Sequence, residues 1–520
     1  MSSAVEFPGL IQPDFEGVHS FLPLVFDDPK DHTLKESQIV QGPSKIRTVK
    51  YQHYYKGIRV FGSLLFKHSK KGKTRIRNKI SQFDLSIRPQ LSETQAADLA
   101  RGFLSHLELK KTPSLQILPH SQENTARLVY WVELQSKTLG LEREIILDAH
   151  SGELLAELDQ HLTIAPIEIF SAENQGIAIL SNPSKPQDPE PHHNCQLLDL
   201  KTKKSVTINA RACQAILNGG SRWTTGQCQV VAGDQGLPIA LDPTFCTWVA
   251  SDGEFLGDAD PSAERALRNS KKVLNYFKDH FDRDSFDNFG SPLVSIVHAG
   301  HHMINAFWDR AKNHMVYGDG DGQEFDDFTH SIDVAGHEMT HGLTAHTANL
   351  VMMGESGALN EAFSDFFGKQ IEEDDSWLIG KSLFKKSLWS PTRGIRDLKN
   401  PHSIVGLLRD PQGKAVNLKH PSRVSEAAFL NEPQPCSPKN DHCWVHFNST
   451  IPGHASYLVT QALGKAKAEL LYYTALTQNL SSTDNFSSAA QAILETCDDL
   501  QFSEHDCRHV REAYEKVEML

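Results

Sequence analysis

Two histidines four residues apart, with a glutamate directly after the first, stand in the stretch "VAGHEMTHGL" (residues 334–343). Positions four apart lie on one face of a helix, so His337 and His341 can present two imidazoles to one metal ion. Glu338 is rotated by ~100° from His337 about the helix axis and can face the open side of such an ion. A catalytic zinc ion takes three protein ligands and keeps a fourth position for water. The stretch predicts a zinc site with its own base, provided that a third ligand exists.

The third ligand is expected in "GESGALNEAFSDFFG" (residues 354–368), where Glu361 follows His337 by 24 residues. A helix that buries one face is indicated by Ala362, Phe363, Phe366 and Phe367. A carboxylate on such a face is costly unless it is paired or bound to metal. Asn360 and Asp365 have the side-chain types that orient ligand histidines through hydrogen bonds. We therefore favour this arrangement over the alternative, in which Glu361 and Asp365 face solvent.

The elements around these residues predict an α+β multidomain protein. The 520 residues are too many for one core, so about three to four domains are expected. Residues 48–68 are typical of two strands joined at Lys56-Gly57. Residues 92–107 are typical of a helix with Ser92 as its N-cap, and two further strands are expected around a turn at Ser151-Gly152. Helical spacing continues over residues 260–281, and helices dominate from Ile332 onward.

Composition excludes some classes of protein. The net charge of −13 disfavours a nucleic-acid partner. The sequence contains no run of ~18 apolar residues, so no membrane span is predicted. No signal peptide is visible at the start of the sequence. The basic stretch over residues 67–79 is interpreted as a solvated hairpin in preference to a binding patch.

All eight cysteines lie after residue 194, and Cys436/Cys443 and Cys497/Cys507 are close in sequence. We favour disulfides formed in an oxidising compartment over free buried thiols, and the spacing leaves the connectivity open. An intracellular peptidase with free thiols is the alternative.

Taken together, the motifs resemble the thermolysin family of zinc metalloproteases, in which a helix with HExxH is followed by a helix carrying GALNE and zinc lies in the cleft between. Three further stretches match that family in order: "INAFWDRAKNHMVYGDGDG" (304–322), "GIRDLKNP" (394–401) and "VHFNSTIPGHASYL" (445–458). The resemblance implies a β-rich subdomain over residues 165–352, which includes the HExxH helix, and a helical subdomain over residues 353–520.

Upstream, "YQHYYKGIRVFGSLL" resembles the propeptide module of thermolysin-like and fungalysin-like precursors, and "LVYWVEL" with "LDAHSGELL" resembles the PepSY module that follows it. This implies an α+β pro-region, divided into residues 1–85 and 86–160. It also implies a precursor that is cut between about Leu155 and Glu168.

The resemblance assigns roles to individual residues. It implies that His337, His341 and Glu361 bind zinc, that Glu338 is the general base and then acid, and that His446, oriented by Asp441, stabilises the oxyanion. Asn360 and Asp365 would support the ligand histidines. Substrate would contact the backbone at Asn305 and Ala306 and the side chain of Arg396. An apolar pocket for the residue after the cut is implied at Val334, Phe325, Phe328, Ile379 and Ile395, although some of these are expected to be plain core residues.

The sequence departs from the family in two places. Met352 stands where the family usually has a tyrosine that helps to hold the oxyanion, and a thioether cannot donate a hydrogen bond. At the family's calcium site Asp333 and Glu372 are present, but Leu378, Lys381 and Ser382 stand where acids are often found. Because lysine repels a divalent cation, at most one calcium ion is expected, and a structural Lys–Glu pair without calcium is the alternative.

The histidines at 298, 301 and 302 are interpreted as surface residues beside the cleft in preference to a second metal site. We expect a secreted, zinc-dependent neutral endopeptidase that acts on proteins and peptides and is made as a precursor inhibited and assisted in folding by its own pro-region. It would prefer a bulky apolar residue after the cut. The alternative is a homologue with low activity, or one that binds without catalysis, for which Met352 is the support.

Overall fold

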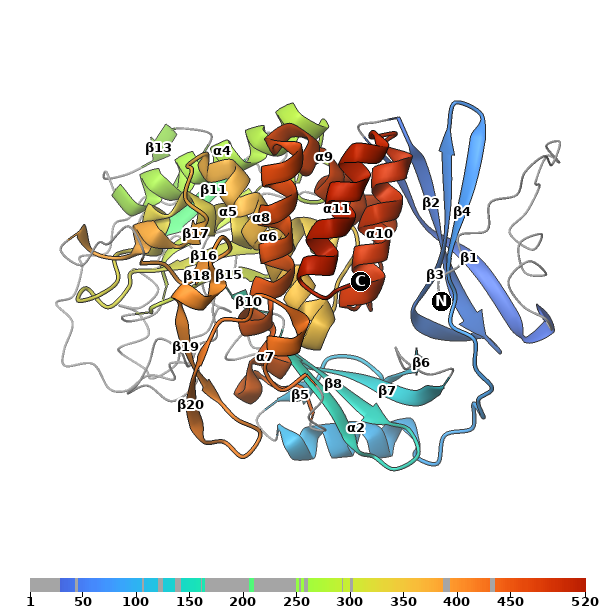
Figure 1. Ribbon diagram of the computed structural model, residues 1–520. Coiled ribbons are helices and arrows are strands. Elements are labelled where there is room, and N and C mark those ends of the chain that lie inside the picture. The colour runs from blue at the N-terminus through green and yellow to red at the C-terminus, as the bar shows by residue number, and fades with distance from the viewer. Residues whose placement is uncertain are drawn as a thin grey trace.

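The computed structural model describes residues 29–42, 45–104, 107–119, 125–135, 142–159, 161–163, 205–209, 249–251, 254–256, 261–291, 293–299, 303–386, 393–430 and 435–520 (Figure 1). The side chain of His298 lies outside the described part of the chain, as do His301, His302, four of the eight cysteines and, within the expected cleavage stretch, Gln160 and residues 164–168.

The first sheet has nine strands in the order β1-β2-β3-β6-β7-β8-β9, with β4 paired to β3 and β5 to β7. The strands are β1 His32–Gln41, β2 Arg47–Tyr55, β3 Ile58–Lys70, β4 Lys73–Lys79, β5 Glu108–Leu109, β6 Ser114–Pro119, β7 Ala126–Gln135, β8 Glu142–Asp148 and β9 Leu154–Asp159. The predicted turn at Lys56-Gly57 is confirmed, and both residues have positive φ. Helix α2, Glu93–Phe103, begins with the expected capping box of Ser92 and Gln95. The segment between β4 and α2 contains the boundary predicted at residue 85, and that division stays a prediction.

The second sheet has seven strands in the order β10-β15-β16-β14-β11-β12-β13. They are β10 His161–Thr163, β11 Ser205–Asn209, β12 Val249–Ser251, β13 Glu254–Leu256, β14 Leu293–Ala299, β15 Ala306–Asp309 and β16 His314–Gly318. Helix α4, Pro261–Phe281, follows the helical spacing of the sequence. The sheet brings β15 beside α5, the helix with the two histidines.

Helices make up most of the rest. They are α5 Ile332–Ala345, α6 Gly354–Glu372, α7 Asp441–Asn448, α8 Thr450–Leu463, α9 Lys465–Thr474, the π-helix η11 Ala475–Asn479, α10 Phe486–Asp499 and α11 Glu504–Lys516. Two small sheets pair β17 Leu378–Ile379 with β18 Arg396–Asp397, and β19 Val405–Arg409 with β20 Ala415–Lys419. Single 3₁₀ turns are η2 Pro29–Asp31, η5 Phe328–His330, η6 Lys381–Leu383, η8 Pro401–Ser403, η9 Val424–Glu426 and η10 Pro438–Asn440.

Helices α5 and α6 pack at very short range. A Cβ at Gly368 would lie 2.4 Å from the carbonyl oxygen of Asp333, so a side chain there would force the two helices apart. Both helices are almost entirely buried, and one large core joins them to α4, β15, β16 and the C-terminal helices. The sequence therefore places its histidines and Glu361 on two helices whose spacing is fixed by glycine.

The basic strand β4 contacts α10 through ion pairs, and Figure 1 shows the strands of this part of the first sheet beside the C-terminal helices. Arg77 Nε lies 2.8 Å from Glu495 Oε2, with both side chains nearly buried, and Lys79 Nζ lies 2.5 Å from Asp484 Oδ1. Arg75 pairs with Asp499. The expected hairpin is confirmed, because β4 pairs antiparallel with β3. The interpretation of its basic side chains as solvated is wrong for Arg75 and Arg77, because α10 supplies their carboxylate partners from more than 400 residues away in sequence.

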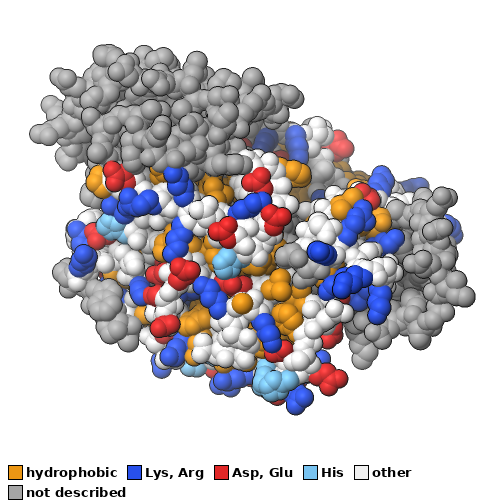
Figure 2. Space-filling view, turned by 90° about the horizontal axis from the view of Figure 1, so that it is seen from above, with side chains coloured by type: hydrophobic (Ala, Val, Ile, Leu, Met, Phe, Trp, Pro, Cys, Tyr) orange, Lys and Arg blue, Asp and Glu red, His pale blue; other side chains and the backbone are white. Residues whose placement is uncertain are grey.

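The covalent and surface features complete the fold. Two of the expected disulfides are present, Cys436–Cys443 and Cys497–Cys507. On the face seen in Figure 2, acidic and basic side chains are interspersed among small apolar patches. Within the described residues, no helix combines the length and apolar character needed to cross a membrane.

Candidate active site

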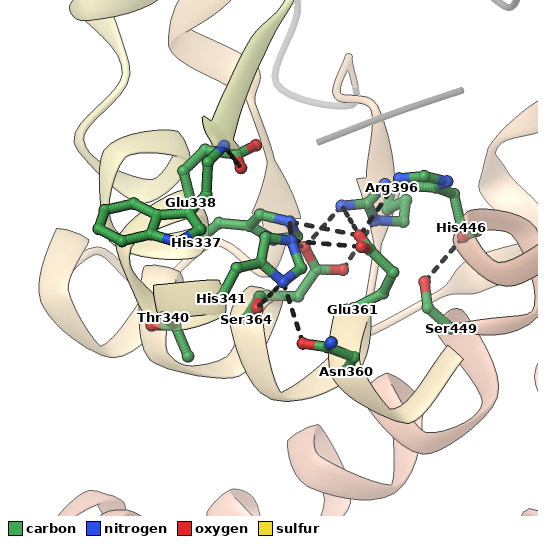
Figure 3. Close-up of polar contacts among 12 residues, drawn as sticks. His337, Glu338, Thr340, His341, Asn360, Glu361, Ser364, Arg396, His446 and Ser449 are labelled. Carbon is green, nitrogen blue, oxygen red and sulfur yellow. Dashed lines mark hydrogen bonds and ion pairs between the residues drawn. The ribbon is translucent and has the colours of Figure 1, made fainter. Parts of the chain in front are cut away.

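His337 and His341 lie one turn apart on α5, and their Nε2 atoms are 3.1 Å apart (Figure 3). Glu361 comes from α6, and its two carboxylate oxygens lie 3.3 Å from these two nitrogens. All three side chains are fully buried, and both oxygens of Glu361 accept no hydrogen bond from the described residues. The three expected ligands are therefore brought together from two helices.

The spacing of these atoms fits a zinc ion. Ligands held about 2.0–2.1 Å from a tetrahedral zinc lie roughly 3.3 Å from one another, close to the 3.1 to 3.3 Å found between the two Nε2 atoms and the carboxylate. One potential ligand atom each from His337, Glu338 and His341 also lies within 4.8 Å of the others. The donor set of two imidazoles and one carboxylate is that of a catalytic zinc site.

A second set of side chains holds the ligands from behind. His337 Nδ1 is 2.8 Å from Asp365 Oδ1, and His341 Nδ1 is 3.0 Å from Asn360 Oδ1, as expected from the sequence. Ser364 Oγ also lies 3.2 Å from His341 Nδ1, a contact that was not predicted from the sequence. Its position one turn after Asn360 on the same helix was the available signal. These contacts fix the imidazole orientations that a metal needs.

Arg396 lies behind Asp365 and is almost completely buried. Its Nε donates to Asp365 Oδ2 and its Nη2 to Asp365 Oδ1, both at 2.7 Å. The side chain thus belongs to the support of His337, while the contact to a substrate carbonyl stays a prediction.

Glu338 faces the edge of the second sheet. The backbone N–H of Trp308 on β15 donates to Glu338 Oε2 at 3.0 Å, a contact not expected from the sequence, and Oε1 has no hydrogen-bond partner among the described residues. Burial raises the pKa of the Glu338 carboxyl well above its ordinary value. A shift in this direction favours uptake of a proton by the Glu338 carboxylate, as a general base requires.

His446 approaches from the other side on α7. Its Nδ1 is 2.5 Å from Asp441 Oδ1, and its backbone N–H donates to Asp441 Oδ2 at 3.1 Å. The Nε2 atom lies 3.5 Å from Glu361 Oε2. Although burial lowers the pKa of His446, the Asp441 and Glu361 carboxylates raise it above its ordinary value. The Asp441–His446 pair lies beside the three expected ligands.

The ligand carboxylate and its imidazoles stabilise each other's charges. Burial alone would raise the pKa of Glu361, but His446, His341 and His337 together hold it well below its ordinary value. Burial likewise opposes the charge of His337, yet Glu361 and Asp365 raise its pKa to about 10. The Glu361 and Asp365 carboxylates thus stabilise positive charge at the centre of the site.

The residues expected around the substrate have different positions. Asn305 is buried, and its Oδ1 accepts the N–H of Ala306 at 2.9 Å. The residues predicted to line a pocket all lie in or against the large core: Val334, Phe325, Phe328, Ile379 and Ile395. Met352 is buried and packs against Val445, directly before His446. The apolar preference after the cut stays a prediction.

Of the two acids expected at a calcium site, Glu372 contacts a lysine and Asp333 accepts backbone N–H groups. The Nζ of Lys369 contacts Glu372 and lies 2.9 Å from Asp374 Oδ1 and 3.2 Å from the carbonyl oxygen of Leu378. Lys381 also contacts Asp374. The carboxylate of Asp333 accepts the backbone N–H groups of Val334 and Gly380 at 2.9 and 2.7 Å. As they lie, these residues fit an ammonium group and not a divalent ion.

Comparison with known proteins identifies the family. The model described as "Thermolysin metallopeptidase, catalytic domain" matches residues 192–345, and "Thermolysin metallopeptidase, alpha-helical domain" matches residues 348–519. Neutral protease NprE of Bacillus pumilus is 36% identical over 263 residues, which are 51% of this chain and 79% of that protein. Neutral protease B of Bacillus subtilis is 28% identical over 513 residues, 93% of this chain and 84% of that protein.

Extracellular elastase of Staphylococcus epidermidis is 33% identical over 271 residues, and the chain covers only 48% of its length. Among solved structures, the precursor of protealysin from Serratia proteamaculans matches with a TM-score of 0.47 and 26% identity, over 63% of this chain and 91% of that one. The family uses zinc, and calcium is typical of it. On its two matching family models and its 36% identity with NprE, the chain belongs to the thermolysin family of metallopeptidases.

Proposed function

We propose that the chain is the precursor of a zinc-dependent neutral endopeptidase. The observation that carries this proposal is the set of two imidazoles and one carboxylate at 3.1 to 3.3 Å, with Glu338 on the same helix. His337, His341 and Glu361 would hold the metal. When bound there, zinc polarises a peptide carbonyl and lowers the pKa of a bound water toward ~7.

The remaining residues have separate roles in proton transfer, charge stabilisation and substrate binding. Glu338 accepts the proton of the attacking water and passes it to the leaving amine. His446 donates from Nε2 to the substrate oxygen as negative charge develops, while Asp441 holds its ring. Asn305 and Ala306 offer backbone groups to an extended substrate. Arg396 contacts a substrate carbonyl and, through Asp365, steadies His337.

The pro-region is proposed to cover the cleft. Its sheet packs Trp131 and Leu158 against a small apolar cluster with Val351 and Met353, which flank Met352. The N–H of Glu157 donates to the carbonyl oxygen of Cys436 at 2.8 Å. Beyond it, β10 pairs with β15, placing Leu162 opposite Trp308, whose N–H contacts Glu338. A chain that pairs with β15 here competes with a substrate strand for the same edge.

We divide the chain into propeptide segments over residues 1–85 and 86–160 and peptidase subdomains over residues 165–352 and 353–520. Cleavage is placed between about Leu155 and Glu168. Export is supported by the two disulfides and by relatives named extracellular. Substrates are proteins and peptides with a bulky apolar residue after the cut.

The test is casein hydrolysis by the processed protein with and without 1,10-phenanthroline. Chelator-sensitive hydrolysis that disappears in Glu338→Gln, while zinc still binds to the variant, is the expected result. Self-processing should also stop in this variant. If wild type matures but shows no chelator-sensitive cleavage, a binding homologue is the better account.

A further inference from the structure

The segment that begins at Asp441 has a left-handed backbone conformation, which is unfavourable for L-amino acids. Asp441, His442, Cys443 and Trp444 have φ of 51°, 49°, 71° and 58°, which places four consecutive residues in the left-handed region. Each such residue is unfavourable because its Cβ approaches the following carbonyl oxygen, and only glycine enters this region freely. None of the four is glycine, so restraints elsewhere must hold the turn.

The turn is what brings Asp441 to His446. On a regular right-handed helix, residues five apart are rotated by ~140° from each other and their side chains diverge. Here both Asp441 oxygens contact His446, one its Nδ1 and the other its backbone N–H. Unwinding the turn to a right-handed form would separate the two side chains.

One covalent restraint lies inside the turn. Cys443, its third residue, is bonded to Cys436, seven residues earlier. Hydrogen bonds support the same loop: the N–H of Cys443 donates to Asn440 Oδ1 at 3.1 Å and that of His442 to the Ser437 carbonyl oxygen at 2.8 Å. Trp444, only 1% exposed, fixes the far end in a small core with Phe447.

We propose that Cys436–Cys443 is a positioning disulfide, which keeps the left-handed turn closed and so holds Asp441 against His446. The disulfide holds Cys443 at a positive φ, which a glycine would adopt without any such restraint. The proposal rests on the proposed function, because its effect is exerted through His446 on peptide hydrolysis.

The chain offers a matched control. Cys497–Cys507 joins α10 to α11 and closes a loop of similar length, with a separation of 10 residues against seven. Neither helix carries a residue of the proposed site. A loss that follows from removing any disulfide would appear in both double variants, whereas a positioning effect would appear in one.

The full chain is expressed in an oxidising compartment as wild type, Cys436→Ser/Cys443→Ser and Cys497→Ser/Cys507→Ser, and matured. Peptide kinetics are normalised to bound zinc. We expect kcat of the first variant to fall by about tenfold or more, because the oxyanion donor His446 is displaced. Its KM should stay within twofold of the wild-type value, because the groups that bind the substrate are unchanged. The zinc content of both variants, and the kcat of the second variant, should stay at the wild-type level.

Two further variants separate positioning from stability. Cys436→Ser/Cys443→Gly should recover most of the lost kcat, because glycine adopts a φ of 71° without penalty. In an Asp441→Ala background, removing the disulfide should cause no further loss. Glycine that restores nothing, or losses that multiply with Asp441→Ala, would overturn the proposal.

If the serine variant does not fold, gentle reduction of the folded wild type tests the same point. Cys436 and Cys443 are both partly exposed, whereas the second bond has one buried partner, Cys497, and one partly exposed partner, Cys507. Peptide mapping identifies the fraction in which only the first bond is open. That state should have low kcat and regain it on reoxidation. Unchanged kcat would contradict the proposal, and absence of hydrolysis in untreated wild type would instead contradict the proposed function.

Discussion

At the scale of single residues, the site is a continuous chain of buried partners. His337 contacts Asp365, which in turn accepts two hydrogen bonds from Arg396, and each side chain is fully or almost fully buried. Burial of this kind is tolerated only because each charge has a partner of opposite sign. Changing one member therefore affects both metal binding and folding, and the two effects can be separated.

Asp365→Ala should lower zinc affinity by about 10- to 100-fold, because His337 loses the acceptor that orients it. It should also lower the free energy of unfolding by about 3 kcal/mol, since the buried Arg396 guanidinium loses its carboxylate. Zinc titration and urea unfolding measure the two quantities. The double variant Asp365→Ala/Arg396→Leu should recover the free energy of unfolding but not the zinc affinity. Recovery of both quantities would show that Asp365 does not orient His337.

Lys369 provides a second residue-scale prediction. Its ammonium, in contact with Glu372 and Asp374, is already the cation of the acid cluster. In a Glu338→Gln background, added calcium should leave the melting temperature of the zinc-loaded chain unchanged. Lys369→Met should melt lower and regain stability when calcium is added, because a ligand that binds only the folded state stabilises it.

The matched control for this experiment is Lys272→Met, which removes an exposed pair with Glu373. Exposed pairs contribute little, so neither its melting temperature nor its calcium response should change. A clear rise in the melting temperature of the chain with native Lys369 on adding calcium would contradict the assignment.

At the scale of elements, the contact between α5 and α6 sets the metal geometry. Gly368→Ala would place a methyl group 2.4 Å from the Asp333 carbonyl oxygen and push the helices apart. Overpacking of this kind typically costs about 1–3 kcal/mol, and here it should also weaken zinc binding. Gly102→Ala on α2, where a Cβ meets nothing within 4 Å, should instead be neutral or stabilising. Thermal unfolding and zinc content of both variants decide the point.

The elements also show what sequence can and cannot predict here. The two ligand histidines were predictable from their spacing on one helix. Glu361, Asn360 and Asp365 were predictable from their side-chain types on an otherwise apolar helix and from the resemblance to the thermolysin family. The turn at Asp441 was not, since nothing local marks four non-glycine residues as left-handed. Nor was the burial of Arg77, which depends on α10, or the contact of Glu338 with Trp308, which depends on sheet pairing. Local periodicity predicted the elements; contacts between distant elements needed the structure.

At the scale of the whole molecule, charged and polar contacts join the first sheet, which belongs to the proposed pro-region, to the proposed peptidase part of the chain. Besides the β4–α10 pairs, Lys50 Nζ donates to the carbonyl oxygen of Thr347 at 3.1 Å, and Gln38 Nε2 to that of His346 at 2.9 Å, both just after α5. The first sheet, part of the proposed pro-region, therefore contacts the segment directly after the helix that carries the two histidines.

Arg77→Met should loosen this grip, because Glu495 would remain buried without its 2.8 Å partner, at a cost of about 3 kcal/mol. Limited proteolysis of the pro-region in the Glu338→Gln background should accelerate, and active chain should mature faster. Arg77→Met/Glu495→Leu should reverse much of the effect. Arg101→Met, which removes an exposed pair on α2, serves as the control and should digest at the parent rate.

The pro-region should also respond to acid through His53. This side chain is fully buried, with Nδ1 2.9 Å from Ser63 Oγ and Nε2 2.9 Å from His32 Nδ1. Burial, and then His32, lowers its pKa from 6.5 to about 3. Below pH ~6.5 the unfolded chain therefore binds a proton that the folded chain does not, and stability falls progressively until pH reaches about 3.

The expected loss is about 2 kcal/mol between neutral pH and pH ~5 for this one group. Hydrogen exchange of β2 and β3 in the Glu338→Gln chain measures it, and His53→Gln should remove that part of the acid sensitivity. His150→Gln, in the turn before β9, controls for the loss of a histidine as such. Because β2 also contacts the end of α5, a pro-region that opens in acid would uncover the peptidase, so self-processing of the active chain should quicken over the same range. Equal acid sensitivity in His53→Gln and its parent would place the response in other groups.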